Sequence, residues 1–352
     1  MRITASQLIP YRLPLRTPWR SAHGFFTHRA GWLVRLESDD GLLGHGDCAP
    51  LPEAGTESPT LALEQLHTQL PQLQGCNPHA ALSALDDAIF RSPAARCALE
   101  TALLDLLAQQ AGLPLARWLN PHAPLTVQAN AMIGGLDEGV AARAKVALSA
   151  GFSILKVKVG LAAPNIELAS LARLFAELPP GAALRLDANG AWDMNQAQHF
   201  IEELTEFAVE SLEEPLANPD LAALQHLQTL APFPLALDES LAKLDMEALL
   251  ASATVRRLTL KPMVLGGVRP AFELAQRAAL AGVSCVATTT VDSAAGVLAA
   301  AHLAAALNNN LAHGLATSSW LLSDLGNSPP MKSGQILLDT AENGLGFHAR
   351  PQ

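Results

Sequence analysis

The chain has 352 residues, which is long enough for one barrel of about 250 residues and a second, smaller unit. Its formal net charge of −10 argues against a nucleic-acid-binding surface, and no apolar run reaches the ~18 residues that a membrane span requires. The four cysteines lie far apart and form no CxxC pair. We therefore expect a cytoplasmic protein with reduced thiols and with neither nucleic acid nor membrane as a partner.

The first part of the chain is expected to be an α+β unit that begins with a three-stranded antiparallel meander. Asp39, Asp40 and Gly41 supply the tight turn between the second and third strands. The segment 21–29 between the first two strands is predicted to be a loop, and whether its Phe25 and Phe26 touch a substrate or only pack is open. The predicted strands cover 3–13, 31–38 and 42–48, and the predicted helices cover 59–70, 80–90 and 94–110.

From residue 125 onward, strand-like runs alternate with alanine-rich amphipathic segments. The central runs recur about every 25 residues, the length of one strand plus one helix in a parallel βα repeat. Seven or eight such units with right-handed crossovers predict an α/β protein with a closed TIM-type barrel. The tail after residue 320 is expected to return to the N-terminal unit. The runs cover 125–131, 154–159, 183–187, 208–213, 234–238, 256–261, 283–287 and, more briefly, 311–315.

Two lysines lie in the apolar run ILKVKVG, at 154–160. Residues two apart on a strand point to the same face, so Lys156 and Lys158 converge on one small volume. Each ammonium group disfavours protonation of the other, and we expect Lys156 to keep Lys158 neutral as a general base. The alternative is a structural one, in which both side chains reach solvent from an edge strand.

Three of the following strands end in acids, and the next one ends in a lysine. Asp187, Glu213 and Asp238 end the three strands, and Lys261 ends the fourth. The C-terminal ends of successive strands face one mouth of a TIM-type barrel, so these side chains are expected to meet Lys158 in one pocket. Three facing carboxylates repel one another unless a cation lies between them, and oxygen ligands favour Mg²⁺, or alternatively Mn²⁺, over zinc.

Five motifs in this order, KVK, DANGAW, EEP, DES and KP, resemble the enolase superfamily, and specifically its muconate-lactonizing subgroup. The resemblance covers nearly the whole chain. It implies a modified (β/α)7β barrel over 113–320 and an N-terminal α+β capping domain over 1–112, completed by about 321–352. The capping domain would place a mobile loop over the substrate. The stretch HGDCAPLPEAG, with Asp47, resembles a similar run of the family in this domain.

The shared reaction of such enzymes gives each candidate residue a role. A divalent cation stabilises the enediolate that forms when a base removes a proton alpha to a carboxylate. Lys158 would remove the proton, and Lys261 would add a second positive charge from the opposite side of the barrel. Asn189 and Glu239 would orient the metal-binding carboxylates. Arg185 also points into the barrel, either toward the site or into a structural ion pair.

Details of the last strands resemble one family within the subgroup. ATTTVDSAAG resembles the S-S-x-x-E-S-x-x-G stretch of o-succinylbenzoate synthases, which makes Thr288 and Asp292 candidate substrate-binding residues. HGLATSSW, around Gly314, resembles the glycine-containing last strand that closes over the succinyl tail. The resemblance implies Mg²⁺-dependent dehydration of 2-succinyl-6-hydroxy-2,4-cyclohexadiene-1-carboxylate to 2-succinylbenzoate in menaquinone biosynthesis. Threonines in place of serines, and aspartate in place of glutamate, depart from that pattern.

Two other functions stay open at the level of sequence. N-acylamino acid racemases and dipeptide epimerases of the same superfamily exchange protons between two lysines, and both Lys158 and Lys261 are present. The chain lacks the K-x-M-K run and the D-x-D pair expected of dipeptide epimerases. A catalytically inactive barrel that serves as a binding protein is the alternative from another class. The expected partner is a small-molecule carboxylate, and a homo-oligomer is an open alternative for the assembly.

Overall fold

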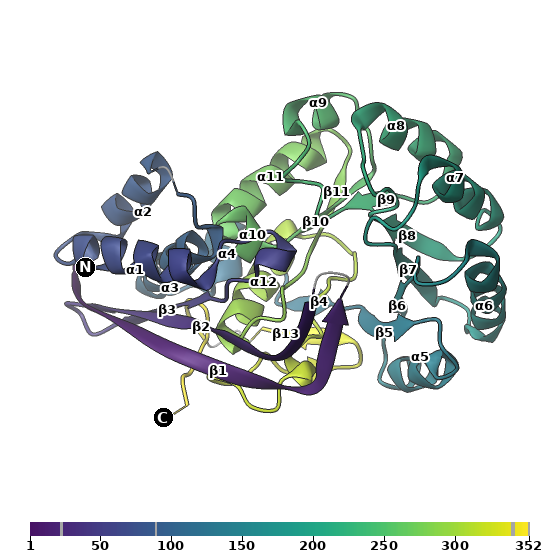
Figure 1. The fold of residues 1–352 in the computed structure, drawn as a ribbon. Helices are drawn as coiled ribbons and strands as arrows, with labels where there is room; N and C mark the ends of the chain where they lie inside the picture. Colours follow the sequence, from purple (N-terminus) through teal and green to yellow (C-terminus); the bar gives the residue numbers. More distant parts are fainter. Residues whose placement is uncertain (22–23, 89, 339–341, 351–352) are drawn as a thin grey trace.

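The computed structural model describes residues 1–21, 24–88, 90–338 and 342–350, without placing the side chains of 19–21, 24 and 25. It has an N-terminal α+β capping domain beside a (β/α)7β barrel, as the sequence predicted (Figure 1). The capping domain begins with the antiparallel strands β1 (Ile3–Ser21), β2 (Gly24–Ser38) and β3 (Leu43–Cys48). Helices α1 (Pro59–Leu73), α2 (Pro78–Asp87), α3 (Pro93–Gln110) and α4 (Leu115–Leu119) follow, and the 3-10 turn η1 (Pro52–Ala54) precedes them.

The segment 21–29 was predicted to be a loop, and this prediction is wrong for most of it. Strands β1 and β2 extend well beyond their predicted ends, and Leu13 pairs with Arg29 while Trp19 pairs with Phe26. Aromatic side chains favour strands, and here they continue the hairpin past a register shift between Pro14 and Trp19. Residues 22 and 23 of the predicted loop lie outside the described ranges, and so does the side chain of Phe25.

The capping sheet packs directly on helix α3, which is buried on nearly every side. A Cβ atom at Gly44 would lie 2.2 Å from the carbonyl oxygen of Ala102, and one at Gly46 would lie 1.9 Å from that of Ala98. Glycine is therefore required at both positions, because any larger residue would push the sheet away from the helix.

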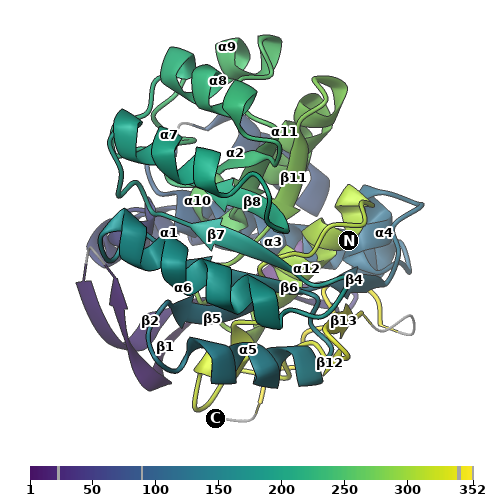
Figure 2. The same cartoon turned by 90° about the vertical axis from the view of Figure 1, so that its right-hand side faces the viewer.

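Seven parallel strands form most of the barrel wall, in the order of the sequence. Helices cover the outside of this wall (Figure 2). The strands are β5 (Ala131–Gly135), β6 (Ile154–Lys158), β7 (Ala183–Asp187), β8 (Val209–Glu213), β9 (Leu235–Leu237), β10 (Arg257–Leu260) and β11 (Ser284–Ala287). The helices are α5 (Val140–Ser149), α6 (Pro164–Glu177), α7 (Met194–Glu203), α8 (Leu221–Leu230), α9 (Met246–Ala251), α10 (Pro262–Leu265), α11 (Val268–Leu280) and α12 (Ala294–Leu307).

The barrel is closed by the segment after α12. His313 forms a parallel bridge with Ala129, and Gly314 forms one with Thr288, so the short strand predicted over 311–315 is reduced to these two bridges. The strand predicted over 125–131 is also divided. Its first part, β4 (Thr126–Gln128), pairs antiparallel with β13 (Gln335–Leu337) of the tail, which also pairs with β12 (Met331–Lys332). The barrel strand β5 therefore begins only at Ala131.

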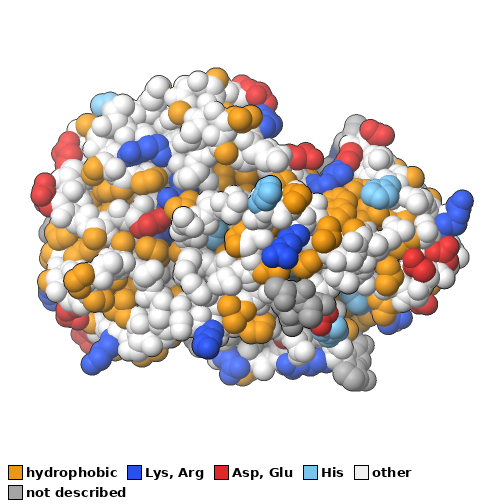
Figure 3. Space-filling model, turned by 180° about the vertical axis from the view of Figure 1, so that it is seen from behind, with side chains coloured by type: hydrophobic (Ala, Val, Ile, Leu, Met, Phe, Trp, Pro, Cys, Tyr) orange, Lys and Arg blue, Asp and Glu red, His pale blue; other side chains and the backbone are white. Residues whose placement is uncertain are grey.

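One continuous core of leucine, alanine and valine side chains runs from the capping domain through the barrel. Charged side chains of both signs are scattered over the rear face, and the outline is notched where the two parts meet (Figure 3). The described ranges contain no helix with the length and apolar character needed to cross a membrane.

Candidate active site

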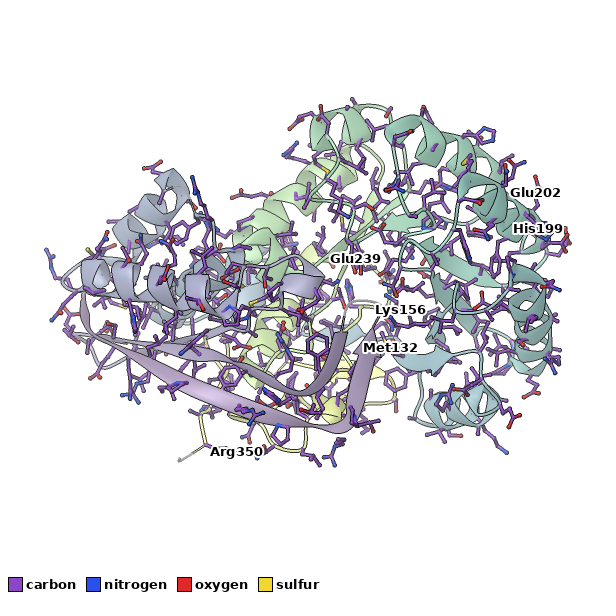
Figure 4. The ribbon with its side chains drawn as sticks, viewed as in Figure 1. Met132, Lys156, His199, Glu202, Glu239 and Arg350 are labelled. Atoms are coloured by element: carbon purple, nitrogen blue, oxygen red, sulfur yellow. The ribbon has the colours of Figure 1, made fainter. Side chains whose placement is uncertain are left out.

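A pocket of about 310 Å³ opens at the C-terminal ends of the barrel strands, beneath the capping domain. Figure 4 shows Lys156, Glu239 and Met132, which all line it, in the region between the barrel strands and the β1–β2 hairpin. Eleven of the twelve site residues predicted from the sequence line this pocket, and Asp292 does not. The eleven are Lys156, Lys158, Arg185, Asp187, Asn189, Glu213, Asp238, Glu239, Lys261, Thr288 and Gly314.

Lys156 lies between two of the predicted metal-binding carboxylates. Its Nζ is 2.7 Å from Glu213 Oε1 and 2.9 Å from Asp187 Oδ2. Burial lowers the pKa of Lys156, but the two carboxylates outweigh this and hold the pKa above its ordinary value. Burial likewise raises the pKa of Asp187, and the charges of Lys156 and Lys158 outweigh it and leave the pKa below its ordinary value. Lys156 is thus a cation whose charge is offset by two neighbouring anions.

Lys261 and Asp238 form a second buried pair on the other side of the pocket. Lys261 Nζ donates a hydrogen bond of 2.5 Å to Asp238 Oδ2. Burial raises the pKa of Asp238 well above its ordinary range, against the lowering effect of Lys261. The pKa of Lys261 lies above its ordinary value, because Asp238 and Glu239 outweigh the effect of its burial. Strand β10, which precedes Lys261, lies four strands away from β6, so Lys261 and Lys158 enter from opposite walls.

Asn189 connects the base candidate to the acidic wall. Its Oδ1 accepts a hydrogen bond of 2.8 Å from Lys158 Nζ, and its Nδ2 donates one of 3.2 Å to Glu239 Oε1. Its backbone N–H donates to Asp187 Oδ1 at 3.1 Å. Asn189 has a left-handed φ of +44°, a conformation that asparagine tolerates better than most residues. The turn after β7 therefore orients a lysine and two carboxylates together.

The carboxylates match the chemistry of a divalent cation, although lysines contact them here. In the described part of the chain, no three histidine, cysteine, aspartate or glutamate side chains are arranged to hold a metal ion as they stand. The oxygens of Asp187 and Glu213 already share one cation, the ammonium group of Lys156, and Asp238 contacts a second. Glu239 Oε2 is buried without a hydrogen-bond partner. Buried carboxylate oxygens of this kind are the ligands that Mg²⁺ prefers.

Two further charged residues of the pocket have structural partners. Arg185 donates from Nε to Glu210 Oε2 at 2.9 Å and from Nη2 to the carbonyl oxygen of Ala312 at 2.9 Å. The structural ion pair, one of the two alternatives for Arg185, is therefore present. Glu214 accepts hydrogen bonds from the backbone N–H groups of Asp238 and Ser240, at 2.6 and 2.8 Å, and thus holds the turn after β9.

The wall formed by β11 and the closing segment carries hydroxyl groups and no charged side chain in the described ranges. Thr288 Oγ1 donates to the carbonyl oxygen of Gly314 at 2.9 Å, and Thr289 Oγ1 is 2.8 Å from Thr317 Oγ1. The prediction that Asp292 contacts substrate is not supported by its position, because this side chain turns back into the protein. Its Oδ1 accepts hydrogen bonds from the backbone N–H and the hydroxyl of Thr290.

Several pocket residues were missed by the sequence analysis. Asn130 accepts a hydrogen bond of 3.2 Å from Arg185, and the hydroxyl of Thr259 is buried without a partner. Thr259 lies two residues before Lys261, so the two-residue period of a strand could have identified it as facing inward. Lys243 also lines the pocket, and the sequence carried no comparable signal for it. Phe26, for which contact with a substrate was left open, lines the pocket as well.

Comparison with known proteins agrees with this geometry. Residues 139–352 match the family described as enolase C-terminal domain-like, and residues 4–119 match the mandelate racemase / muconate lactonizing enzyme N-terminal domain. The chain therefore belongs to the enolase superfamily, and it is an enzyme of that class.

Named relatives carry out different reactions. An N-succinyl-L-Arg/Lys racemase of Bacillus cereus is 26% identical, over 86% of this chain and 84% of the relative. An o-succinylbenzoate synthase of Thermosynechococcus vestitus is 34% identical, over 65% of this chain and 66% of the relative. The crystal structure of a dipeptide epimerase from Enterococcus faecalis, complexed with Mg and the dipeptide L-Leu-L-Tyr, superimposes with a TM-score of 0.90. It is 27% identical, and the match covers 99% of both chains.

Proposed function

We propose that the protein is an o-succinylbenzoate synthase, which dehydrates 2-succinyl-6-hydroxy-2,4-cyclohexadiene-1-carboxylate to 2-succinylbenzoate. The observation that carries this proposal is the hydroxyl-lined wall of Thr288, Thr289, Thr290 and Thr317, which faces the pocket without a carboxylate in the described ranges. The free ammonium group of a dipeptide would have no anionic partner on this wall, and a desolvated charge without a partner is costly. A substrate whose distal arm carries carbonyl oxygens is better matched, because the Thr289 and Thr317 hydroxyls share one hydrogen bond and keep one O–H group that can donate to such an oxygen.

Lys158 is the proposed base for the ring proton alpha to the carboxylate. Its hydrogen bond to Asn189 aims the amine into the pocket. As the C–H bond breaks, its electron pair delocalises into the carboxylate, and it then forms the ring double bond as the C–O bond of the neighbouring hydroxyl group breaks. The Lys158 ammonium then returns the proton to the departing hydroxide as water. Lys261, from the opposite wall, remains a cation and stabilises the negative charge that develops on the carboxylate.

Asp187, Glu213 and Asp238 are the residues that would hold Mg²⁺, with Mn²⁺ as the alternative. The ion, when bound, acts as a Lewis acid on the substrate carboxylate and lowers the barrier by several kcal/mol. Asn189 orients Asp187 through its backbone N–H, and Glu214 holds the backbone at Asp238. These two residues keep the carboxylates in place while the substrate enters and leaves.

A second candidate is racemisation of N-succinylamino acids, and the opposed lysines favour it. Racemisation requires one base on each face of the alpha carbon, and Lys158 and Lys261 stand on opposite walls. An N-succinyl group carries no free ammonium, so it is also compatible with the uncharged wall. The relative from Bacillus cereus acts on N-succinylated arginine and lysine by its name.

The deciding experiment compares three substrate classes with the same metal-loaded protein. The cyclohexadiene carboxylate, a panel of N-succinylamino acids and a panel of dipeptides are assayed with Mg²⁺ and after treatment with a chelator. We expect fast dehydration, slower or no racemisation, and no dipeptide epimerisation. Efficient racemisation with an untouched cyclohexadiene would overturn the synthase proposal in favour of the racemase.

A further inference from the structure

Val291 holds a strained backbone conformation in the wall of the pocket. Its φ is +63°, in the left-handed region, and it is one of the residues that line the pocket. A β-branched residue is a genuine outlier in this region, because its branched Cβ is crowded by the following carbonyl group. Such a conformation persists only where the surrounding structure determines it. The neighbouring residues Thr288, Thr289 and Thr290 form the hydroxyl-lined wall.

Arg29, on strand β2 of the capping domain, supplies the contact that holds Val291. Its Nε donates a hydrogen bond of 3.1 Å to the carbonyl oxygen of Val291. The same guanidinium donates to the carbonyl oxygens of Ala49 at 2.7 Å and Pro50 at 3.3 Å, so it spans the junction between the capping domain and the barrel. Arg29 is 3% exposed, and no carboxylate of the described residues forms an ion pair with it. The N–H groups of the Arg29 guanidinium therefore donate to backbone carbonyl oxygens rather than to a carboxylate.

A second contact from the capping domain fixes the residue on the other side of the turn. Asp47, on β3, accepts hydrogen bonds from the backbone N–H of Ser293 at 2.9 Å and from its hydroxyl at 2.8 Å. Asp47 can approach so closely because position 296 is glycine, where a Cβ atom would lie 2.8 Å from Asp47 Oδ2. Asp292 bonds back to Thr290, so the turn 290–293 is held from both domains.

We propose that Arg29 is a positioning residue that holds Val291 in its left-handed conformation, so that the capping domain sets the shape of the substrate-binding wall. This inference rests on the proposed function only in taking 288–290 as the wall that contacts the distal arm of the substrate. Without the Arg29 hydrogen bond, Val291 would relax toward an ordinary conformation and shift the neighbouring threonines. A residue that merely docked the two domains would have no specific relation to the side chain at 291.

A double-mutant cycle tests this relation. Arg29→Gln removes the hydrogen bonds, and we expect it to raise KM for the cyclohexadiene or the N-succinylamino acid at least tenfold, with a smaller loss in kcat. Val291→Gly alone gives the reference KM for the double variant, because it removes a side chain that lines the pocket while glycine takes positive φ without steric cost. In the double variant, Val291→Gly should restore most of the KM lost in Arg29→Gln. Equal KM values for Arg29→Gln and the double variant would overturn the proposal.

Two matched controls separate positioning from general destabilisation. Arg256→Gln also removes hydrogen bonds to two backbone carbonyls, those of Ala231 and Phe233, at the other end of the barrel. It should lower Tm without the increase in KM. Ala253→Gly replaces another left-handed residue, with a φ of +45°, which does not line the pocket. It should not rescue Arg29→Gln, and a rescue equal to that of Val291→Gly would overturn the proposal.

The thermal stability of the same proteins gives a readout that does not depend on the substrate. Relief of strain predicts that the Tm lost in Arg29→Gln is larger when residue 291 is glycine, because only valine releases strain when Arg29 no longer holds it, and additive Tm changes would contradict this. If the wild-type protein turned over none of the three substrate classes, the proposed function would be wrong. The Tm values of the four proteins would still test the role of Arg29. If Arg29→Gln does not fold, Arg29→Lys, which keeps the charge and loses the fork, takes its place in the cycle.

Discussion

Two clusters of buried charge occupy successive levels of the same barrel. The lower one contains Arg185, Glu210 and Arg257, and both arginines donate to the single carboxylate. The upper one lies at the mouth, where the carboxylates of Asp187, Glu213, Glu214, Asp238 and Glu239 stand among Lys156, Lys158 and Lys261. In the lower cluster, no side-chain nitrogen or oxygen of the three residues is buried without a partner, whereas Glu239 Oε2 of the upper cluster is.

The difference between the two clusters indicates which buried charges are structural and which are available to bind a ligand. In the lower cluster, Glu210 accepts hydrogen bonds from Arg185, Arg257 and Ser211, and this network is complete within the protein. In the upper cluster, acids outnumber lysines, and burial raises the pKa of Glu213 and Asp238 above their ordinary values. Removing one member of a complete buried network destabilises a fold because it leaves a charge without a partner, while an excess of one charge is relieved by a ligand of the opposite charge. Substitutions in either cluster test this distinction.

The largest effect is expected at the base. Lys158→Ala should lower kcat by a factor of about 10²–10⁴, the usual contribution of a general base, with little change in Tm. Turnover of the cyclohexadiene and solvent deuterium incorporation into N-succinylamino acids measure the loss. Lys145→Ala, on the exposed side of α5, is the matched control and should be active. If Lys158→Ala retained more than about a tenth of the activity, Lys158 would not be the general base.

A carboxylate from each cluster separates metal binding from stability. Asp187→Asn should weaken Mg²⁺ binding at least ~100-fold in isothermal titration calorimetry, because a neutral amide replaces a charged ligand. Glu210→Gln should leave Mg²⁺ binding within about threefold of wild type, since Glu210 lies one level below the mouth and bonds to arginines. Equal losses in both variants would mean that the two clusters are not functionally distinct.

Glu210→Gln should instead destabilise the protein by about 3 kcal/mol at pH 7, because it leaves two buried arginines without an anion. The arginines lower the pKa of Glu210 from 4.5 to about 2, against the effect of burial. A lowered pKa contributes stability that is present above pH 4.5 and is lost as the pH falls toward 2. Urea unfolding at several pH values should therefore show the two proteins converging in acid. A constant difference down to pH 2.5 would contradict the assignment.

The smallest effect concerns a buried group that carries no charge. His302 on α12 accepts a hydrogen bond from the backbone N–H of Ala116 at 3.0 Å, and burial lowers its pKa from 6.5 to about 4. The unfolded chain binds the proton first, so stability is lost as the pH falls from 6.5 toward 4. Wild type should lose about 2 kcal/mol more than His302→Gln between pH 7.5 and pH 5. Parallel unfolding curves would show that His302 is not held neutral.

The sequence predicted the parts of the site that lie at strand ends. Spacing alone brought Lys158, Asp187, Glu213, Asp238 and Lys261 to one pocket, because a parallel barrel aligns the same end of every strand. Local composition likewise predicted most helices and strands of the fold. These predictions succeed because they depend on hydrophobic period and turn residues, which are local properties of the chain.

Features that depend on distant pairing could not be predicted in this way. Asn130 lies in the break between β4 and β5, which the sequence predicted as one strand, and it contacts Arg185 in the pocket. Strand β4 is separate because it pairs with β13, which is far away in the sequence. The side chain of Asp292 turns away from the pocket after the left-handed Val291, a conformation that no local pattern indicates. The expected repulsion between Lys156 and Lys158 stays a prediction, now with two carboxylates beside Lys156 that the sequence did not place there.

The closing segment has a consequence for the synthesis of the protein. Seven strands of the wall are complete before the ribosome adds His313 and Gly314, whose bridges to Ala129 and Thr288 join its two edges. The first strand of the capping domain also lacks one contact until late in synthesis, because Leu15 forms a bridge with Leu321. At about 5–20 residues per second, the open edges of β5 and β11 remain exposed for seconds on a nascent chain. The barrel is therefore protected from edge-to-edge aggregation only once this late segment has bridged both open edges.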